Sequence, residues 1–491
     1  MLKKGTLRLR RLTACIAACA VALSLTACGS ADTTADGRNA DGTVTISMAG
    51  WTLATRPEFQ ALAKGFEQTH PNIHIDVKEY SADDYDKQLI ADLSAGKAPD
   101  VFPMKNLKMY YTYASPGALA DLSDEAAKFD GDDNLAVIKD YSIDGKTYAL
   151  PYRVDATVLY YNKTMFNKAG VDAPDGTWTW DDYLAVCREL KKKLPAAGYK
   201  DAYPTYHHTS FQSIPQAIAL AQRAAKDAAK DGDSNGSDGG GNNSNGDGSN
   251  ANSGNGGNSV DATSAQSDLF FSGDYSYLKP MYKLFLTMQH EDLTLSYNTV
   301  SSSKTTYQSQ FGTQKAALLP MGTWFMGPLA DQQASGDADK FEWGVAALPQ
   351  LSKSTTDAPV TYGDPTGFAV SANSPSAKMK AAKQFVAWAA GEEGAKVTAK
   401  TGSLPAYLSK AALDAFFAKS GLPADKQSRE VIRKSVILQE NPVGEATQVI
   451  QDELNMAQSS ILSETKTTDD ALAKAANAIA NTGLLPKSQG K

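Results

Sequence analysis

The first part of the chain alternates between strand and helix patterns. Residues 44–51 alternate apolar and polar side chains, which predicts a half-buried strand. The apolar residues of 57–70 recur at i, i+3, i+4 and i+7 and predict a helix. Residues 73–77 predict a second strand, 83–96 a second helix, and 99–102 a short third strand. This β-α-β-α-β order is typical of an α/β lobe.

Residues 148–170 form the most distinctive pattern of the chain because they combine aromatic, charged and β-branched side chains. The β-branched and aromatic residues of 154–161 favour a strand, and Pro151 suits only the start or the edge of a strand. Asn162 is typical of a helix start and Gly170 of a helix end. We interpret this segment as a strand that crosses a cleft, with only one of its faces available to a ligand.

The C-terminal part predicts two buried strands, at 316–324 and 345–349, and a turn-rich loop at 361–367. Apolar residues return to helical spacing in the tail. The predicted tail helices cover 382–389, 450–461 and 472–479.

Residues 231–259 interrupt this pattern with Gly, Asn, Ser and Asp at 28 of 29 positions. Such a stretch buries no apolar surface, and we predict a disordered surface insertion between a helix ending near Ala229 and one starting near Tyr275. Within it, 232–236 matches the hydrolase pattern G-x-S-x-G, but no strand precedes the match and no helix follows it. The start of a calcium loop also matches, but Asn242 stands where a bidentate Glu is required.

The N-terminus has the features of a secretion signal. Residues 1–27 contain five cationic residues, no acid and an apolar run at 12–25. The run ends in Leu25-Thr26-Ala27-Cys28, which resembles the lipobox at which bacterial lipoproteins are cleaved and lipidated on Cys28. The alternative is an uncleaved signal anchor, although a membrane-spanning helix needs about twenty apolar residues.

Removal of this signal would change both the net charge of the chain and its number of cysteines. Losing its five cations takes the net charge from −7 to −12, and such an acidic surface argues against nucleic acid as a partner. Cys187 is then the one remaining thiol, and it lies on the apolar face of a helix that starts with a capping box at 179–182. We expect it to be buried and inert. Residues 28–42 lack apolar periodicity and predict a lipid-anchored flexible tether.

Metal and nucleophilic chemistry have little support in the sequence. The chain has five histidines, and Pro71 prevents His70 and His74 from sharing a helix. Tyr160 and Tyr161 suggest a ferric site, but neighbours on a strand point to opposite faces. We therefore expect no metal and no cofactor.

A set of aromatic and polar residues at strand ends remains as the candidate ligand site. In open α/β sheets, ligands bind outside the carboxyl ends of the strands. Flat aromatic faces cover the C–H surface of a sugar, while amide, guanidinium and carboxylate groups bind its hydroxyls. The candidate ligand-binding residues are Trp51, Asn106, Tyr152, Arg153, Asp155, Trp324, Tyr362 and Asp364.

Several motifs, in their order and spacing, resemble extracellular solute-binding protein family 1, the maltose-type binding components of bacterial ABC importers. The similarity extends from about Thr43 to Gly483. Its carriers are Ala95-Gly96-Lys97-Ala98-Pro99-Asp100-Val101, Leu150-Pro151-Tyr152, Tyr161-Asn162-Lys163, Phe166-Asn167-Lys168-Ala169-Gly170, Thr179-Trp180-Asp181, Phe311-Gly312 through Ala317 to Trp324, and Gly402-Ser403-Leu404-Pro405.

The resemblance implies a two-lobed, α/β periplasmic-binding-protein-like fold of type II, with a ligand cleft between the lobes and a multi-crossing hinge. The implied crossings lie near 154–158, near 361–368 and after Leu404. Lobe 1 would hold 43–155 with 362–420, and lobe 2 would hold 156–361 with 421–491, including the 231–259 insertion. Hinge closure around the ligand is the implied mechanism.

The implied function is capture of a di- or oligosaccharide and its delivery to the permease subunits of an ABC importer, without enzymatic activity. The chain would be a monomer, held by its lipid anchor on the extracellular face of the cytoplasmic membrane. Two alternatives stay open. One is a secreted lipoprotein glycoside hydrolase with two catalytic carboxylates. The other is a binding protein for iron, a phosphoester or a polyamine.

Overall fold

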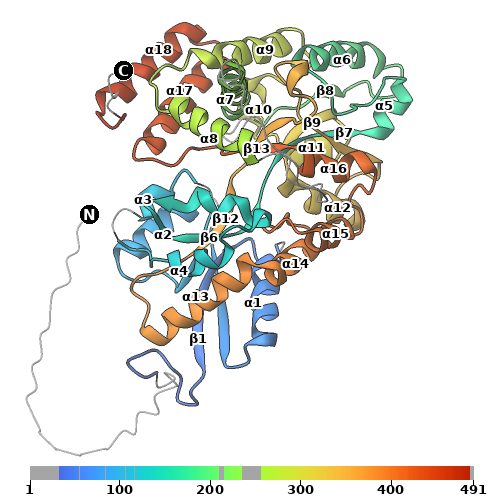
Figure 1. Ribbon diagram of the computed structural model, residues 1–491. Helices are drawn as coiled ribbons and strands as arrows, with labels where there is room; N and C mark the ends of the chain where they lie inside the picture. Colours follow the sequence, from blue (N-terminus) through green and yellow to red (C-terminus); the bar gives the residue numbers. More distant parts are fainter. Residues whose placement is uncertain are drawn as a thin grey trace, which may run out of the picture.

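The chain forms two α/β bodies, which Figure 1 shows one above the other. We call the lower body, with the N-terminal strands, the first half, and the upper body the second half. The predicted signal, Cys28 and Asn106 lie outside the residues that the structure describes. This computed structural model describes residues 33–54, 56–82, 84–105, 107–114, 117–208, 215–234 and 256–486.

The first half is built on a five-stranded sheet in the order β2-β1-β3-β12-β6. Its strands are β1 (Val44–Trp51), β2 (Ile73–Tyr80), β3 (Val101–Met104), β6 (Ala149–Val154) and β12 (Pro365–Val370). β1 is parallel to β2 and β3, whereas β12 is antiparallel to β3 and β6. Pro151 fits within β6 because β6 is an edge strand. The strands predicted in 44–102 are confirmed.

Helices cover this sheet and bury its apolar faces. Phe66 of α1 meets the rings of Phe385 and Trp388 of α13 at 5.4 and 5.6 Å. Each fully buried side chain of this kind contributes about 1.5–3 kcal/mol. The helices of the first half are α1 (Glu58–Thr69), α2 (Tyr85–Ser94), α3 (Tyr110–Ala114), α4 (Ser123–Ala126), η1 (Ala127–Phe129), η2 (Asp133–Tyr141), α13 (Ser376–Ala390) and α14 (Glu392–Lys400). Two short strands, β4 (Ser142–Ile143) and β5 (Lys146–Thr147), also belong to it.

The second half is built on a four-stranded sheet in the order β10-β7-β9-β8. Its strands are β7 (Thr157–Asn162), β8 (Tyr203–Thr205), β9 (Ala316–Gly322) and β10 (Trp343–Ala346). Two short strands, β11 (Val360–Tyr362) and β13 (Val436–Leu438), pair separately. Its N-terminal helices are α5 (Lys163–Ala169), α6 (Trp180–Lys193), α7 (Pro215–Ser234), α8 (Gly256–Phe270), η3 (Ser276–Leu278), α9 (Lys279–His290), α10 (Tyr297–Ser303) and α11 (Tyr307–Phe311). Its C-terminal helices are η4 (Thr323–Phe325), α12 (Met326–Ser335), η5 (Lys353–Thr355), α15 (Lys410–Phe417), α16 (Lys426–Lys434), α17 (Thr447–Leu462) and α18 (Thr468–Asn481).

Residues 148–170 form two strands where the sequence predicts one. β6 lies in the first sheet and β7 in the second, and Asp155 and Ala156 connect them. The predicted helix start is confirmed, because the Asn162 side chain accepts a hydrogen bond from the amide of Met165 at 2.9 Å. The predicted end is confirmed as well, because Gly170 has a φ of 60°, which glycine adopts without strain.

The predicted capping box and buried thiol are also confirmed. Thr179 and Asp182 exchange side-chain-to-backbone hydrogen bonds at the start of α6. Cys187 lies in the apolar core of the second half, where burial raises the pKa of its thiol.

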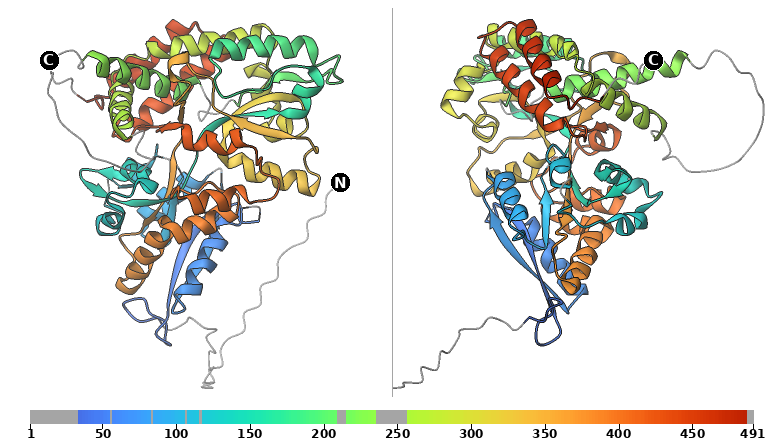
Figure 2. Two further views of the ribbon diagram at one scale, coloured as in Figure 1. Left: turned by 45° about the vertical axis from the view of Figure 1, so that its right-hand side comes forward. Right: turned by 90° about the vertical axis from the view of Figure 1, so that its left-hand side faces the viewer.

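Within the described part of the chain, three segments pass between the halves and lie side by side. The first is Asp155-Ala156, and the second is Gly363-Asp364, between β11 and β12. The amide of Asp155 donates to the carbonyl of Asp364 at 3.3 Å. The third leads from α14 to α15, where the carbonyl of Leu404 accepts from the amide of Val154 at 3.1 Å. Figure 2 shows these connections between the two bodies from two further sides.

The apolar cores place α15 with the second half. Leu413 and Phe416 belong to the cluster that contains Phe325 and Leu329, whereas Phe385 of α13 belongs to the core of the first half. The chain therefore changes core between α14 and α15. The exact lobe boundaries given above stay predictions.

The structure describes parts of both segments that the sequence predicts to be disordered. α7 continues to Ser234 and α8 begins at Gly256, so the two ends of 231–259 are helical, and 235–255 lies outside the described residues. α8 was missed by sequence reasoning; it packs along α7, as Figure 2 shows.

The described end of the predicted tether, from residue 33 to 42, contacts the first half. The amide of Ala377 donates to the carbonyl of Asp36, and the backbones of Arg38 and Val44 form an antiparallel β-bridge. The predicted flexible tether is therefore ordered from residue 33 onward. Among the described residues, no helix is long and apolar enough to span a membrane.

Candidate functional site

Arg153 is the last but one residue of β6 and lies at the centre of a buried charge cluster. Its side chain is 7% exposed and forms ion pairs with Glu58 at 3.4 Å and Asp155 at 3.7 Å. Its Nε donates to the hydroxyl of Thr366 at 3.1 Å, and the guanidinium lies 6.0 Å from the ring centre of Trp51. The cluster therefore joins the carboxyl ends of β1 and β6 to the crossing segment.

Glu58 is a site residue that sequence reasoning missed. It is 1% exposed in the first turn of α1, where its carboxylate accepts from the hydroxyls of Tyr152 and Ser403 at 3.1 and 2.5 Å. Burial alone raises the pKa of Glu58, but the positive charges of Arg153 and Arg56 outweigh that effect and hold the pKa below its usual value. Its position at the start of the helix that follows the strand ending on Trp51 is the signal that could have identified it.

Asp155 connects this cluster to the second half. Burial raises the pKa of Asp155, and Arg153 and Arg56 offset only part of that rise. The next residue, Ala156, exchanges two hydrogen bonds with Thr323 across the crossing, at 3.2 and 2.9 Å. The end of β9 is thereby fixed beside Asp155.

Trp324 lies on the second-half side of this junction. It is half-buried, and its ring covers the Cα of Gly322, where an added Cβ would lie 1.8 Å from the ring. Burial raises the pKa of Tyr307, and a hydrogen bond from Trp324 and the charge of Arg56 oppose that rise. Arg56 of the first half and Tyr307 of the second half are thus close enough to interact. Sequence reasoning missed both residues.

Three other predicted ligand residues lie in apolar cores. Trp51 is 3% exposed and meets the edges of Phe59 and Tyr85. Tyr152 is 1% exposed and stacks on Phe368 at 4.2 Å. Tyr362 is 1% exposed within the core of the second half. These three side chains are therefore core residues, whereas Arg153, Asp155 and Trp324 lie at the junction.

Asp364 is occupied by hydrogen bonds from the protein itself. Its carboxylate accepts from the amides of Leu107 at 3.1 Å and Glu440 at 2.8 Å, and from the side chain of Asn441 at 3.3 Å. These donors come from two separate segments, one after β3 and one after β13. Asp364 therefore holds the second crossing to the segments that contain Leu107 and Glu440. Asn106 lies outside the described residues, next to Leu107.

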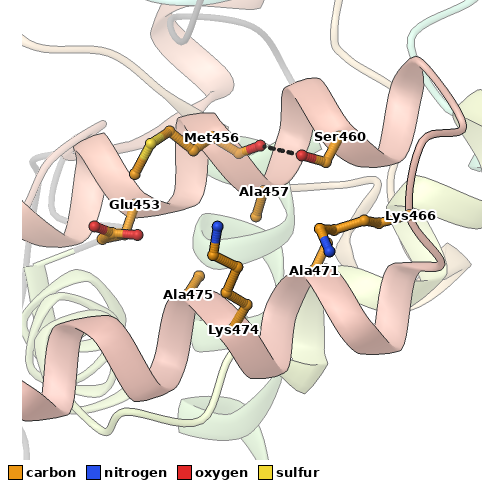
Figure 3. Close-up of a pocket in the computed structure, with 8 residues that line it drawn as sticks. All are labelled: Glu453, Met456, Ala457, Ser460, Lys466, Ala471, Lys474 and Ala475. Carbon is orange, nitrogen blue, oxygen red and sulfur yellow. Dashed lines mark hydrogen bonds between the residues drawn. The ribbon is translucent and has the colours of Figure 1, made fainter.

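Other parts of the described chain offer little chemistry. No group of three potential His, Cys, Asp or Glu metal ligands occurs among the described residues. Figure 3 shows a pocket of about 30 Å³ between α17 and α18, in which Glu453 and Lys474 face each other across the gap and Met456 is 54% exposed. A pocket of about 460 Å³ lies along α16. Neither pocket contains a predicted ligand-binding residue.

Comparison with known proteins identifies relatives and structural neighbours. The melibiose/raffinose/stachyose-binding protein MelE of Bacillus subtilis is 25% identical over 402 residues, which are 81% of this chain and 81% of that protein. The diacetylchitobiose-binding protein DasA of Streptomyces coelicolor is 33% identical over 204 residues, which are 40% of this chain and 45% of that protein.

Among solved structures, a sugar transporter from Rhizobium etli in an open conformation matches with a TM-score of 0.70 and 26% identity, over 89% of this chain and 99% of that one. A substrate-binding protein of Listeria monocytogenes in complex with cycloalternan matches with a TM-score of 0.62 and 22% identity, over 90% of this chain and 99% of that one. The predicted type II periplasmic solute-binding fold is thereby confirmed. A family model described as bacterial extracellular solute-binding protein matches residues 50–396, and the chain belongs to this family.

Proposed function

We propose that this protein binds a di- or oligosaccharide at the junction of its halves and delivers it to an ABC importer. The observation that carries the proposal is the joint placement of Arg153, Asp155 and Trp324 beside the crossings. Charged groups bind hydroxyls and an aromatic face covers the C–H surface of a sugar. The sugar-binding names of MelE and DasA support the same ligand class.

Isothermal calorimetry on the purified protein tests this function. The panel contains melibiose, raffinose, stachyose and diacetylchitobiose, together with longer glycans. We expect at least one sugar to bind with a Kd of about 1 μM, which corresponds to about −8 kcal/mol. No heat from any sugar, with a folded protein by circular dichroism, would reject the proposal.

The same complex tests whether the ligand is altered. Solute-binding proteins generally are not enzymes, and we propose that the bound sugar leaves unchanged. Chromatography of the sugar after long incubation distinguishes this from hydrolysis, which yields shorter products. Colour or metal in the purified protein would instead favour iron as the ligand.

Replacing Trp324 tests its proposed contact. Trp324→Ala is expected to lower affinity more than tenfold, or about 1.4 kcal/mol, because the variant loses the flat face against the sugar. The free energy of unfolding should barely change, since this ring is only half-buried. Trp178→Ala is the control, because Trp178 is also half-buried but packs on a different apolar cluster of the second half from that of Trp324, and this variant should keep its affinity for the sugar. A stability loss equal to the affinity loss would mark Trp324 as a core residue.

We also propose a lipid anchor at Cys28, supported by the lipobox sequence that precedes it. The family is extracellular or periplasmic, so an anchor would keep the protein near its importer. Cys28→Ser is expected to move the protein from the membrane fraction to the soluble fraction of the producing cells. An unchanged distribution of the variant would contradict lipidation at this position.

A further inference from the structure

Three half-buried rings of the second half form a connected set beside the crossings. They are Trp324 of η4, Tyr307 at the start of α11, and His208 after β8. The ring centres of His208 and Tyr307 lie 5.5 Å apart, and the two ring planes meet at 80°. The ring of Tyr307 lies 4.9 Å from that of Phe325, the residue that follows Trp324. We call Trp324, Tyr307 and His208 the aromatic wall.

The aromatic wall differs from the rings behind it in exposure. Phe325, Phe311 and Tyr206 are at most 1% exposed and belong to one apolar cluster. Tyr307 and Trp324 pack against this cluster from its border and stay half-buried. Each of these two rings therefore rests on the core with one part and leaves another part uncovered. An uncovered aromatic face is suited to the C–H surface of a sugar.

Contacts within the protein fix the position of the aromatic wall. The hydroxyl of Tyr206 donates to the carbonyl of Thr305 at 2.7 Å, which joins the chain before His208 to the chain before Tyr307. Thr306 then starts α11 with a capping box. The backbone on both sides of these rings is thus held without a ligand. Such preorganisation lowers the entropy that a ligand must lose on binding.

Polar groups accompany these rings. The Nδ1 atom of His208 is buried and has no hydrogen-bond partner among the described residues. An imidazole nitrogen donates or accepts a hydrogen bond, so part of this capacity is unused by the protein. Arg56 of the first half lies close enough to Tyr307 for its charge to act on the hydroxyl. Flat faces and hydroxyl-binding groups therefore occur together here.

We propose that Tyr307 and His208 form a second sugar subsite next to Trp324, so that the protein binds two adjacent rings of its ligand. The inference rests on the proposed function and extends it from one sugar ring to two. Trp324 covers the first ring and Tyr307 the second, while His208 and Arg56 bind hydroxyls of the second ring. A monosaccharide fills only one of the two places and binds more weakly.

Calorimetry on Tyr307→Leu and Tyr307→Phe, with the same sugar panel, tests the subsite. Both new side chains fill the space against Phe325, but only phenylalanine keeps a flat face. Tyr307→Leu is expected to lower the affinity for the bound sugar about tenfold. Tyr307→Phe loses only the hydroxyl and should stay within about threefold of the unaltered protein. Circular dichroism checks that both variants are folded.

Tyr297→Leu is the matched control. Tyr297 is also half-buried and also begins a helix, but it packs on the other apolar cluster of the second half, and its hydroxyl donates to Ser459 at 2.9 Å. This variant should keep its affinity. Equal affinities of Tyr307→Leu and Tyr307→Phe, or an equal loss in Tyr297→Leu, would overturn the subsite and leave the sugar-binding function intact. No binding of any sugar to the unaltered protein would overturn both.

Two further measurements test the second ring and His208. The shortest sugar of the panel that binds should bind at least about tenfold more tightly than its component monosaccharides, and Tyr307→Leu should reduce this ratio. His208→Leu is expected to lower the affinity about threefold or more, because the hydrogen bond of the imidazole is lost. A monosaccharide that binds as tightly as the longer sugar, or an unchanged affinity in His208→Leu, would contradict the proposal.

Discussion

Arg153→Met is expected to lower the free energy of unfolding by about 3–5 kcal/mol, because it leaves buried carboxylates without their cation. Glu58 and Asp155 both pair with Arg153, and the side chains of Arg153 and Glu58 are 7% and 2% exposed. Methionine fills similar volume, so the loss reports on charge and hydrogen bonds. Chemical denaturation at pH 7, followed by circular dichroism, measures it.

Two further variants make this test specific. Adding Glu58→Gln to Arg153→Met removes one of the two buried charges that have lost their partner, and should restore part of the free energy of unfolding. Arg188→Met is the control, because Arg188 also forms an ion pair, with Glu291, but its side chain is 46% exposed. An exposed pair of this kind contributes under about 1 kcal/mol. Equal losses in Arg153→Met and Arg188→Met would contradict the importance of burial.

Gly363→Ala is expected to cost about 3 kcal/mol or more, because two crossing segments touch at this glycine. A Cβ atom on Gly363 would lie 1.7 Å from the carbonyl oxygen of Asp155 and 3.1 Å from the Cα of Ala156. These atoms belong to the backbone, so the two crossings would have to separate. Denaturant unfolding measures the loss, and calorimetry with the bound sugar should show weaker binding.

Gly391→Ala provides the matched comparison for this substitution. Gly391 has a φ of −84°, and the nearest atom to an added Cβ lies 3.6 Å away, which is ordinary contact distance. This change is expected to alter stability by less than about 1 kcal/mol. If Gly363→Ala were equally mild, the close approach of the crossings would not be a structural constraint.

Local structure was predicted well because local signals are enough to specify it. The alternation of residues 44–51 identifies β1, and Asn162 and Gly170 delimit α5 through their own backbone and side-chain bonds. α8 (Gly256–Phe270) is the exception, since it begins among Gly, Asn and Ser, which are weak helix formers. That helix packs along α7, and the periodicity of its own residues does not reveal this contact.

The candidate site was predicted in part. The residues that were missed are placed by contacts between segments that are distant in the sequence. The carboxyl-end rule led to Arg153, Asp155 and Trp324, but not to Glu58, which contacts Tyr152 from 94 positions away in the sequence. Asp364 is a candidate ligand residue because it belongs to the set at strand ends, and its contact with a ligand stays a prediction. In the structure its oxygens accept from Leu107 and Glu440, which are 257 and 76 positions away.

The sequence by itself determined the α/β class, most strands and helices, the family resemblance and a buried Cys187. These features depend on composition, on periodicity and on motifs, which neighbouring residues carry. Only the tertiary structure decided that residues 148–170 divide between two sheets and that Arg153, Glu58 and Asp155 share one buried charge cluster. It also decided which carboxyls are paired with a cation and which are buried without one. The physical reason is that desolvation and pairing depend on segments distant in the chain, and their approach is set by the packing of both halves.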